Sequence, residues 1–204
     1  RRILLCVGIV DELPDLPGYR QLWGRSLYQC PYCHGWELRD RAWGYLANDV
    51  ACLEWSLLLR AWTPDLVVFT SGRFAVRGED RELLERCRIR LDERPVVGFR
   101  AEGESLAAVQ LAGGAEVRRE VMFVRPPQRQ TGLVMGLVAS FGLKLATPDR
   151  VHVDNHQTSV RGIYAAGDLA SSAHGALIAA GSGNAAAHAL GEDLTRELLL
   201  EGML

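Results

Sequence analysis

No apolar run in the chain approaches the roughly 18 to 20 residues that a membrane-spanning helix requires. The apolar stretch after Arg1 and Arg2 is also too short for the core of a secretory signal. Neither sign of charge dominates, because the formal net charge is −2, and this gives no general attraction to nucleic acid or to an anionic membrane. With 48% hydrophobic and 24% charged residues, the composition is typical of a globular domain, and we expect a soluble cytoplasmic protein.

Cysteine is scarce, and its spacing is not that of a secreted domain held together by disulfides. There are five cysteines, an odd number, and only Cys30 and Cys33 lie close together in the sequence. Cys6, Cys52 and Cys87 stand in apolar or amphipathic stretches, where we expect each to be a small buried hydrophobic residue. The pair is therefore the only cysteine pattern with a chemical interpretation.

Strand and helix patterns alternate through the first half of the chain. A buried strand is predicted at residues 2–10, two more at 43–47 and 66–70, and helices at 50–62 and 81–88. This β-α-β-α order is typical of a parallel sheet, so we assign the chain to the α/β fold class.

The second half begins with short strands separated by glycines. We expect three of them to form a small antiparallel meander: residues 96–100, 106–111 and 117–124. Helices are predicted at 131–141 and, in an alanine-rich stretch, at 176–200. Short strands at 151–153 and 162–166 lie between these helices.

Two cysteines three positions apart carry the clearest chemistry. Cys30 and Cys33 have the spacing at which two thiols can close a small, readily reduced disulfide, and Pro31 and Gly35 suit a tight turn into a helix. His34 either passes a proton to the departing thiolate or has a packing or orienting role. The alternatives for the pair are a purely structural role and half of a zinc site, which needs two more ligands and finds no second C-x-x-C. We predict a redox-active pair and no metal.

The segment around this pair resembles a known family. Residues 30–37 (CPYCHGWE) resemble the redox box of the low-molecular-weight thioredoxin reductases, and most of all the branch that includes the dithiol oxidases of disulfide natural products. Residues 11–18 are similar to the linker that enters that family's pyridine-nucleotide domain, and residues 158–168 to its second flavin motif. The resemblance covers essentially the whole chain, in the family's order.

The resemblance implies a Rossmann-like nucleotide-binding domain inserted into a Rossmann-like FAD-binding domain. Residues 1–21 would be the end of a first FAD-domain segment and a linker, residues 22–125 the NAD(P)-type domain with the redox pair, and residues 126–204 the second FAD-domain segment. The family's first G-x-G-x-x-G lies upstream of the region at which this chain starts. We therefore expect either a fragment of a longer protein or a protein with half of its flavin site.

On the flavin side, the resemblance points to residues at two places. Gly167 lets the backbone approach a ligand after a short strand, and Asp168 would hold a ribityl hydroxyl of FAD. The alternative for Asp168 is a helix N-cap. His174, Gly175 and Ala176 would present backbone N–H groups to the flavin ring at the start of the long helix.

The nicotinamide side departs from the family pattern. Only Gly44 and the small Ala51 fit the expected glycine-rich turn, and Asp49 would place a negative charge beside a pyrophosphate. Arg73 and Arg77 are candidates to hold a 2′-phosphate, although either can equally be a solvated loop charge. We expect NADPH to bind weakly.

These observations favour an FAD-dependent dithiol/disulfide oxidoreductase. By resemblance, Cys30 would exchange with the substrate, Cys33 would exchange electrons with flavin, and His34 would be the acid/base. Electrons would pass to oxygen, which makes the enzyme a dithiol oxidase. One alternative is NADPH-dependent reduction of thioredoxin, and another is a non-catalytic homologue that serves as a binding module. The expected partners are a small-molecule dithiol or disulfide or a thioredoxin-like protein, within a homodimer.

Overall fold

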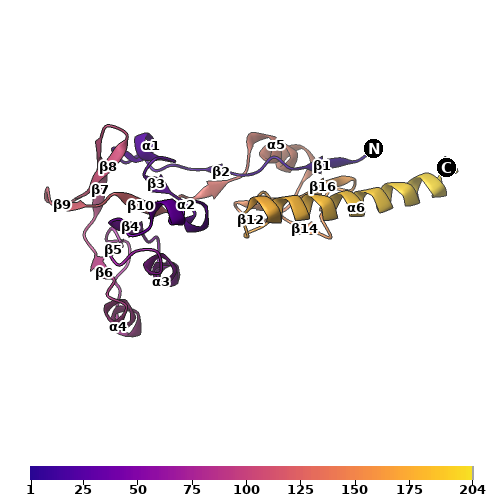
Figure 1. Cartoon of the computed structure of the whole chain (residues 1–204). Helices are drawn as coiled ribbons and strands as arrows, with labels where there is room; N and C mark the ends of the chain where they lie inside the picture. Colours follow the sequence, from indigo (N-terminus) through magenta and orange to yellow (C-terminus); the bar gives the residue numbers. More distant parts are fainter. Residues whose placement is uncertain (204) are drawn as a thin grey trace. The chain divides into compact units, whose positions relative to one another are not determined.

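The computed structural model describes residues 1–203 and divides into two compact units (Figure 1). The central unit is Leu13–Pro126, and the terminal unit combines Arg1–Glu12 with Pro127–Leu204. Residues 13–21, which the sequence assigned to the N-terminal segment, thus belong to the same unit as the redox pair. Leu204, the last residue of the predicted segment 126–204, lies outside the described residues.

The central unit is built on a five-stranded parallel sheet in the order β3-β10-β4-β5-β6. Its strands are β3 (Leu27–Tyr28), β4 (Trp43–Leu46), β5 (Leu66–Phe69), β6 (Arg90–Asp92) and β10 (Val121–Val124). Because all of the pairings are parallel, the carboxyl ends of the strands share one edge. The α/β fold class predicted from the sequence is confirmed.

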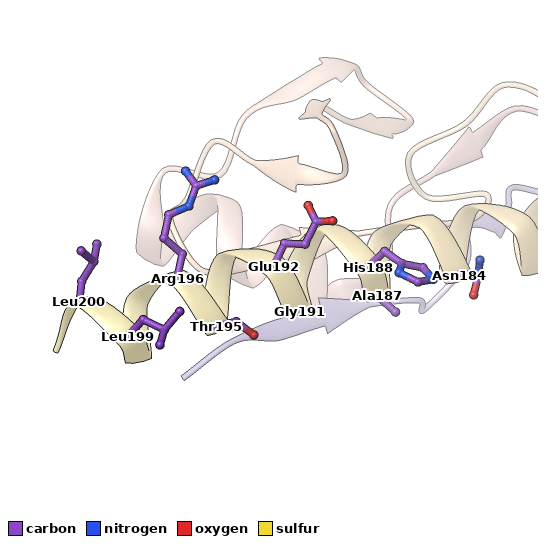
Figure 2. A pocket seen from close by; sticks show the side chains of 9 residues that line it. All are labelled: Asn184, Ala187, His188, Gly191, Glu192, Thr195, Arg196, Leu199 and Leu200. Carbon is purple, nitrogen blue, oxygen red and sulfur yellow. The ribbon is translucent and has the colours of Figure 1, made fainter. Parts of the chain in front are cut away.

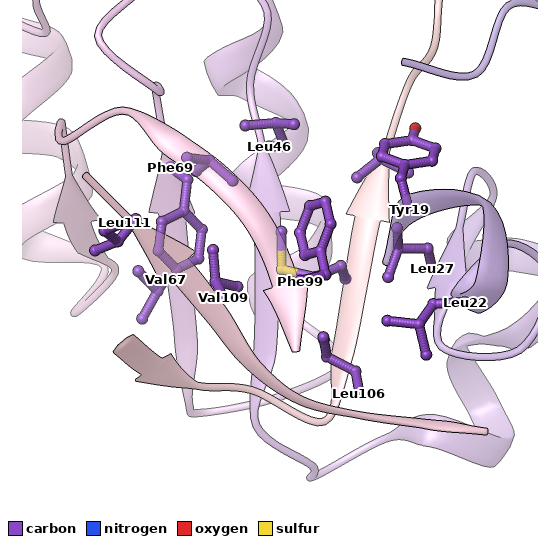
Figure 3. Close-up of a cluster of buried hydrophobic side chains, with 13 residues drawn as sticks. Tyr19, Leu22, Leu27, Leu46, Val67, Phe69, Phe99, Leu106, Val109 and Leu111 are labelled. Carbon is purple, nitrogen blue, oxygen red and sulfur yellow. The ribbon is translucent and has the colours of Figure 1, made fainter. Parts of the chain in front are cut away.

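Both faces of this sheet are buried at β4, β5 and β10, which explains why these three strands are continuously apolar. Alternate residues point to opposite sides, so Val67 and Phe69 enter one hydrophobic cluster while Leu66 and Val68 enter another. Figure 3 shows the first cluster, in which Phe69 and Val67 of the sheet lie near Phe99 of the antiparallel strands. The second cluster lies under the helices.

The antiparallel meander contains β7 (Val96–Glu102), β8 (Ser105–Leu111) and β9 (Glu116–Arg118). The prediction that residues 117–124 form the third strand of the meander is wrong. This segment divides into β9, which completes the meander, and β10, which pairs between β3 and β4. All four residues of β10 are buried, as a strand covered on both faces requires.

The helices of the central unit are α1 (Tyr19–Leu22), α2 (Pro31–Leu38), α3 (Glu54–Arg60) and α4 (Gly78–Arg86). The helix predicted at 50–62 begins instead as a 3-10 turn, η1 (Val50–Leu53), before α3. The helix predicted at 81–88 begins earlier, at Gly78. In both cases the apolar spacing located the helix but not its first turn.

The terminal unit contains a four-stranded mixed sheet in the order β1-β16-β15-β14. Its strands are β1 (Ile3–Leu5), β14 (Val153–Asp154), β15 (Gln157–Thr158) and β16 (Ile163–Ala165). Strand β1 pairs in parallel with β16, so both ends of the chain contribute to one sheet. The predicted strand at 2–10 is therefore wrong in length, because Gly8 adopts φ +68 and interrupts it.

Shorter ladders and two helices complete the terminal unit. The remaining strands are β2 (Val10–Asp11), which pairs with β11 (Gln128–Arg129), and β12 (Leu145–Thr147), which pairs with β13 (Arg150–Val151). Helix α5 spans Gly132–Phe141 and is capped by the Thr131 hydroxyl, which accepts from Val134 N–H. These elements enclose a small core around Leu5, Val134 and Leu169.

Helix α6 (Ala176–Leu200) packs on β1, β15 and β16 along one side only. Ala186 is its one buried residue, and a shallow hollow lined by Asn184, His188 and Arg196 runs along its exposed side (Figure 2). No helix within residues 1–203 is both long and apolar enough to cross a membrane.

Candidate functional site

The redox pair lies at the junction between β3 and α2, at the carboxyl edge of the parallel sheet. Cys30 is the N-cap of α2, with extended backbone angles (φ −119, ψ 115), and Pro31 occupies the first helical position. Proline is favoured there because its fixed φ suits the helix and its missing N–H would have no partner in any case. Cys33 follows one turn later, and its N–H donates to the Cys30 carbonyl at 3.3 Å. The local fold thus brings the two side chains to one helix end.

The two thiols are free in this structure and differ in their environments. Cys33 is exposed and Cys30 is half-buried. A hydrogen bond to the Cys30 side chain raises the pKa of the Cys33 thiol, and partial burial raises it further. The Cys33 thiol is therefore the donor of this hydrogen bond, and the Cys30 sulfur accepts it.

Helix α2 carries aromatic side chains on two neighbouring faces beside the thiols. His34 is exposed and its ring lies against Tyr28, with 4.5 Å between the ring centroids. Since His34 stands four residues after Cys30, the two share one face of the helix. On the neighbouring face, Tyr32 is 73% exposed and Trp36 is 65% exposed. No role was predicted for these two rings from the sequence, although both residues stand within the motif beside the cysteines.

Gly35 explains how α2 can pack closely on the sheet unit. It is buried, and a Cβ at this position would lie 3.0 Å from Cδ2 of Trp62. Trp36 is held on the opposite side by Arg39, whose guanidinium lies 4.0 Å from the ring centroid. The helix is therefore fixed at the indole of Trp62 while its reactive face remains open.

The residues predicted for a nicotinamide cofactor lie on different elements. Gly44 is buried inside β4, where a Cβ would collide with the sulfur of Met122, so packing accounts for this glycine. Ala51 is exposed within η1. Arg73 follows β5 at the same sheet edge, and its guanidinium donates to the side-chain oxygen of Asn48.

The turn after β4 is closed by the chain's own side chains. The Asp49 carboxylate accepts from Cys52 N–H at 2.9 Å and caps η1. In a dinucleotide-binding turn, a cofactor phosphate would accept a hydrogen bond from this N–H. The Asn48 amide donates to the Arg125 carbonyl at 2.7 Å while it accepts from Arg73. A carboxylate and an engaged arginine do not fit a pyrophosphate, so these residues do not fit NADPH.

The predicted flavin residues lie after β16 in the terminal unit. Gly167 has φ +81, a conformation that favours glycine, and it ends the buried strand. Asp168 is half-buried, and its carboxylate has no hydrogen-bond or ion-pair partner within the described chain. No helix begins at Asp168, since α6 starts at Ala176, so the alternative role as a helix N-cap is wrong.

The start of α6 offers further donors in the same unit. Gly175 is the N-cap and has no side chain to satisfy the first N–H groups, which therefore remain available to a ligand. His174, Gly175 and Ala176 are all exposed, and the His174 ring contacts the Ser171 carbonyl at 3.1 Å. An unpaired carboxylate together with a free helix N-terminus matches a ligand that carries both hydroxyl groups and anionic or carbonyl oxygens. The residues present thus fit FAD.

The remaining cysteines and histidines show no such arrangement. Cys6 is exposed, so the expectation that it would be buried is wrong, whereas Cys52 and Cys87 are half-buried and pack against the second hydrophobic cluster. His152 and His156 have a spacing found in zinc sites, but residues 1–203 contain no group of three His, Cys, Asp or Glu side chains that would hold a metal ion.

The fold and these residues define an α/β protein with a Rossmann-type sheet that presents a C-x-x-C pair at its carboxyl edge. No protein-family model matches the chain. Thioredoxin reductase tcpT of Claviceps purpurea is 30% identical over 178 residues, which cover 82% of this chain and 54% of the relative. The chain thus spans slightly more than half the length of this curated relative.

Solved structures agree with this comparison. The crystal structure of HlmI superposes with a TM-score of 0.87 and 33% identity, covering 99% of this chain and 63% of that chain. The putative thioredoxin reductase TrxB from Bacillus anthracis gives 0.84 and 30%, covering 96% and 65%. The chain belongs to the thioredoxin reductase-like family, and the resemblance stated from the sequence is confirmed.

Proposed function

We propose that the chain is the thiol-exchanging part of an FAD-dependent dithiol/disulfide oxidoreductase that uses oxygen as its electron acceptor. The observation that carries this proposal is that Cys30 and Cys33 lie at one helix end, Cys30 as the N-cap of α2 and Cys33 one turn later. The family supports an oxidoreductase. The free Asp168 carboxylate and the open start of α6 support FAD.

The oxidised pair would accept electrons from a substrate dithiol by two exchanges. A substrate thiolate attacks the Cys30 sulfur, the Cys30–Cys33 bond breaks, and Cys33 leaves as a thiolate that takes up a proton. The second thiolate of the substrate then attacks the substrate sulfur of the mixed disulfide, and Cys30 leaves as a thiolate that takes up a proton. The substrate becomes a disulfide, and the two electrons and two protons remain on Cys30 and Cys33.

The role of Cys30 as the thiol that exchanges with substrate comes from the family resemblance, because Cys33 is the more exposed of the two cysteines. The raised pKa of Cys33 favours protonation of the thiolate that leaves first. His34, exposed and on the Cys30 face of α2, exchanges protons between the thiols and solvent. Asp168 and the start of α6 would hold FAD, which would supply a two-electron acceptor for the dithiol and a donor for the reduction of oxygen to hydrogen peroxide.

The choice of oxygen over NADPH rests on the turn after β4. The names of the relatives favour a thioredoxin reductase, but Asp49 occupies the helix start where a phosphate of NADPH would bind. A small-molecule dithiol is the substrate we propose, because Tyr32 and Trp36 place apolar rings beside the thiols. A thioredoxin-like protein is the other candidate, and we propose a homodimer from the family resemblance.

Replacement of the two cysteines one at a time should have different effects on the formation of a mixed disulfide. Cys33→Ser should hold a substrate disulfide as a mixed disulfide on Cys30, whereas Cys30→Ser should form none on Cys33. Both variants should lose oxygen consumption with a dithiol, and Cys6→Ser, which changes an exposed thiol of the other unit, should keep it. Mass spectrometry and an oxygen electrode measure these outcomes. Full turnover in both single variants would contradict the assignment of the pair.

A further inference from the structure

Two side chains from elsewhere in the same unit hydrogen-bond to the backbone on either side of Asp168. Before Asp168, the Gly167 N–H donates to the hydroxyl of Ser182 on α6 at 3.2 Å. After Asp168, the Leu169 carbonyl accepts from Nε2 of Gln130 at 3.0 Å. The backbone around Asp168 is therefore fixed by one bond from α6 and one from the residue just before the cap of α5.

Gln130 is an unusual residue to find at this place. It is only 1% exposed, and its amide nitrogen also donates to the Asp149 carbonyl at 2.6 Å. Its Oε1 is buried without a partner among residues 1–203, which makes a polar side chain costly here. An apolar side chain of equal length would avoid that cost, so the two bonds that the amide donates are what distinguish glutamine at this position.

The Asp168 side chain itself takes no part in these bonds. Its backbone neighbours are tethered, while its half-buried carboxylate accepts from no group of the described chain. A carboxylate that is fixed in place but unpaired is arranged to accept hydrogen bonds from a ligand.

We propose that Ser182 and Gln130 are positioning residues that aim the Asp168 carboxylate at the hydroxyl-bearing chain of a bound flavin. The proposal rests on the FAD site of the proposed function. It adds two residues that no motif marks, one on α6 and one in the segment before α5, which act through Asp168 and do not touch the ligand themselves.

The test measures FAD affinity and folding stability separately. Ser182→Ala and Gln130→Met should each raise the FAD Kd about five- to tenfold, the effect of one hydrogen bond. Ser182→Thr, which keeps the hydroxyl, should restore the Kd. The matched control is Ser159→Ala, which removes a Ser hydroxyl that accepts from Lys144 N–H at 2.8 Å in the same unit. It should lower the free energy of unfolding similarly and leave the Kd unchanged.

The mechanism through Asp168 gives a second criterion. In an Asp168→Ala background, Ser182→Ala should change the Kd by less than about twofold, because the group that it positions is gone. An unchanged Kd in both Ser182→Ala and Gln130→Met, or an equal increase in Ser159→Ala, would overturn the proposal.

Failure of the flavin site itself would give a different result. If the unaltered chain binds no FAD, the residues present do not suffice to hold the cofactor, and the positioning is tested by hydrogen exchange. The amides of residues 167–170 should then exchange faster in Ser182→Ala and Gln130→Met than in the unaltered chain and in Ser159→Ala. Equal exchange in all four proteins would overturn the positioning role.

Discussion

The two cysteines of the pair are chemically distinct because of a single turn of helix. Cys30 is an N-cap and Cys33 lies three residues later, so the Cys33 thiol can donate to the Cys30 sulfur. The bond stabilises the protonated Cys33, and it contributes to folding below the pKa of an ordinary thiol. That contribution is lost as the pH rises through the raised pKa of Cys33.

Removal of the acceptor should therefore shift the reactivity of Cys33. In Cys30→Ala the pKa of Cys33 should fall toward that of an ordinary thiol, so alkylation of Cys33 by iodoacetamide begins at a lower pH than in the unaltered chain. Peptide mass spectrometry over a pH series measures this. The exposed Cys6 is the internal reference and should give the same curve in both proteins. A curve for Cys33 that does not move would contradict the hydrogen bond.

The sequence located the residues of the site better than it explained their roles. The C-x-x-C spacing and the strand-Gly-Asp pattern are local, so Cys30 and Asp168 were found without a structure. Gly44 was misleading, because a glycine that makes room for Met122 and a glycine that admits a cofactor look the same in a sequence. Ser182 and Gln130 give no local signal, since each acts on a residue far away in the chain.

At the scale of elements, helix α2 illustrates how packing positions the pair. Its buried face meets the sheet unit at Gly35 and Trp62, and its exposed face carries Tyr32 and Trp36. An added Cβ at Gly35 would lie 3.0, 3.2 and 3.3 Å from three atoms of the Trp62 ring system. The indole is rigid, so the helix itself would have to move.

Gly35→Ala should destabilise the protein by about 1–3 kcal/mol through overpacking. The double variant with Trp62→Leu should lose less stability than the sum of the single variants, since the obstacle is gone. Urea unfolding followed by circular dichroism measures both. Gly136→Ala is the control, because this helical glycine has open space around its Cβ position and alanine there should stabilise by about 0.5–1 kcal/mol. Equal effects at the two glycines would refute this account of α2.

Element prediction succeeded where the pattern is local and failed where pairing is distant. Helix α6 was predicted over 176–200 and spans Ala176–Leu200, because its alanine-rich composition favours helix over its whole length. Strand β10 was placed in the meander, because residues 117–124 were predicted to form a single strand. The structure instead turns at Arg119 and Glu120, whose bonds to Asp65 and Ala42 no local pattern reveals.

At the scale of the whole molecule, two compact units divide the chemistry. The central unit carries the redox pair and a nucleotide-type sheet, and the terminal unit joins β1 to β16 and carries Asp168 and α6. The α/β class followed from alternating strands and helices in the sequence. The pairing of the two chain ends in one sheet was inferred from the family resemblance, since strands so far apart in the sequence give no local sign that they pair.

The most direct test of the account uses the visible absorbance of the flavin-loaded chain without oxygen. A dithiol should bleach the flavin through Cys30 and Cys33, NADPH should leave it coloured, and readmitted oxygen should restore the colour after the dithiol. In Cys33→Ser the dithiol should no longer bleach it. Bleaching by NADPH as fast as by the dithiol, or bleaching of Cys33→Ser by the dithiol at the unaltered rate, would contradict the account.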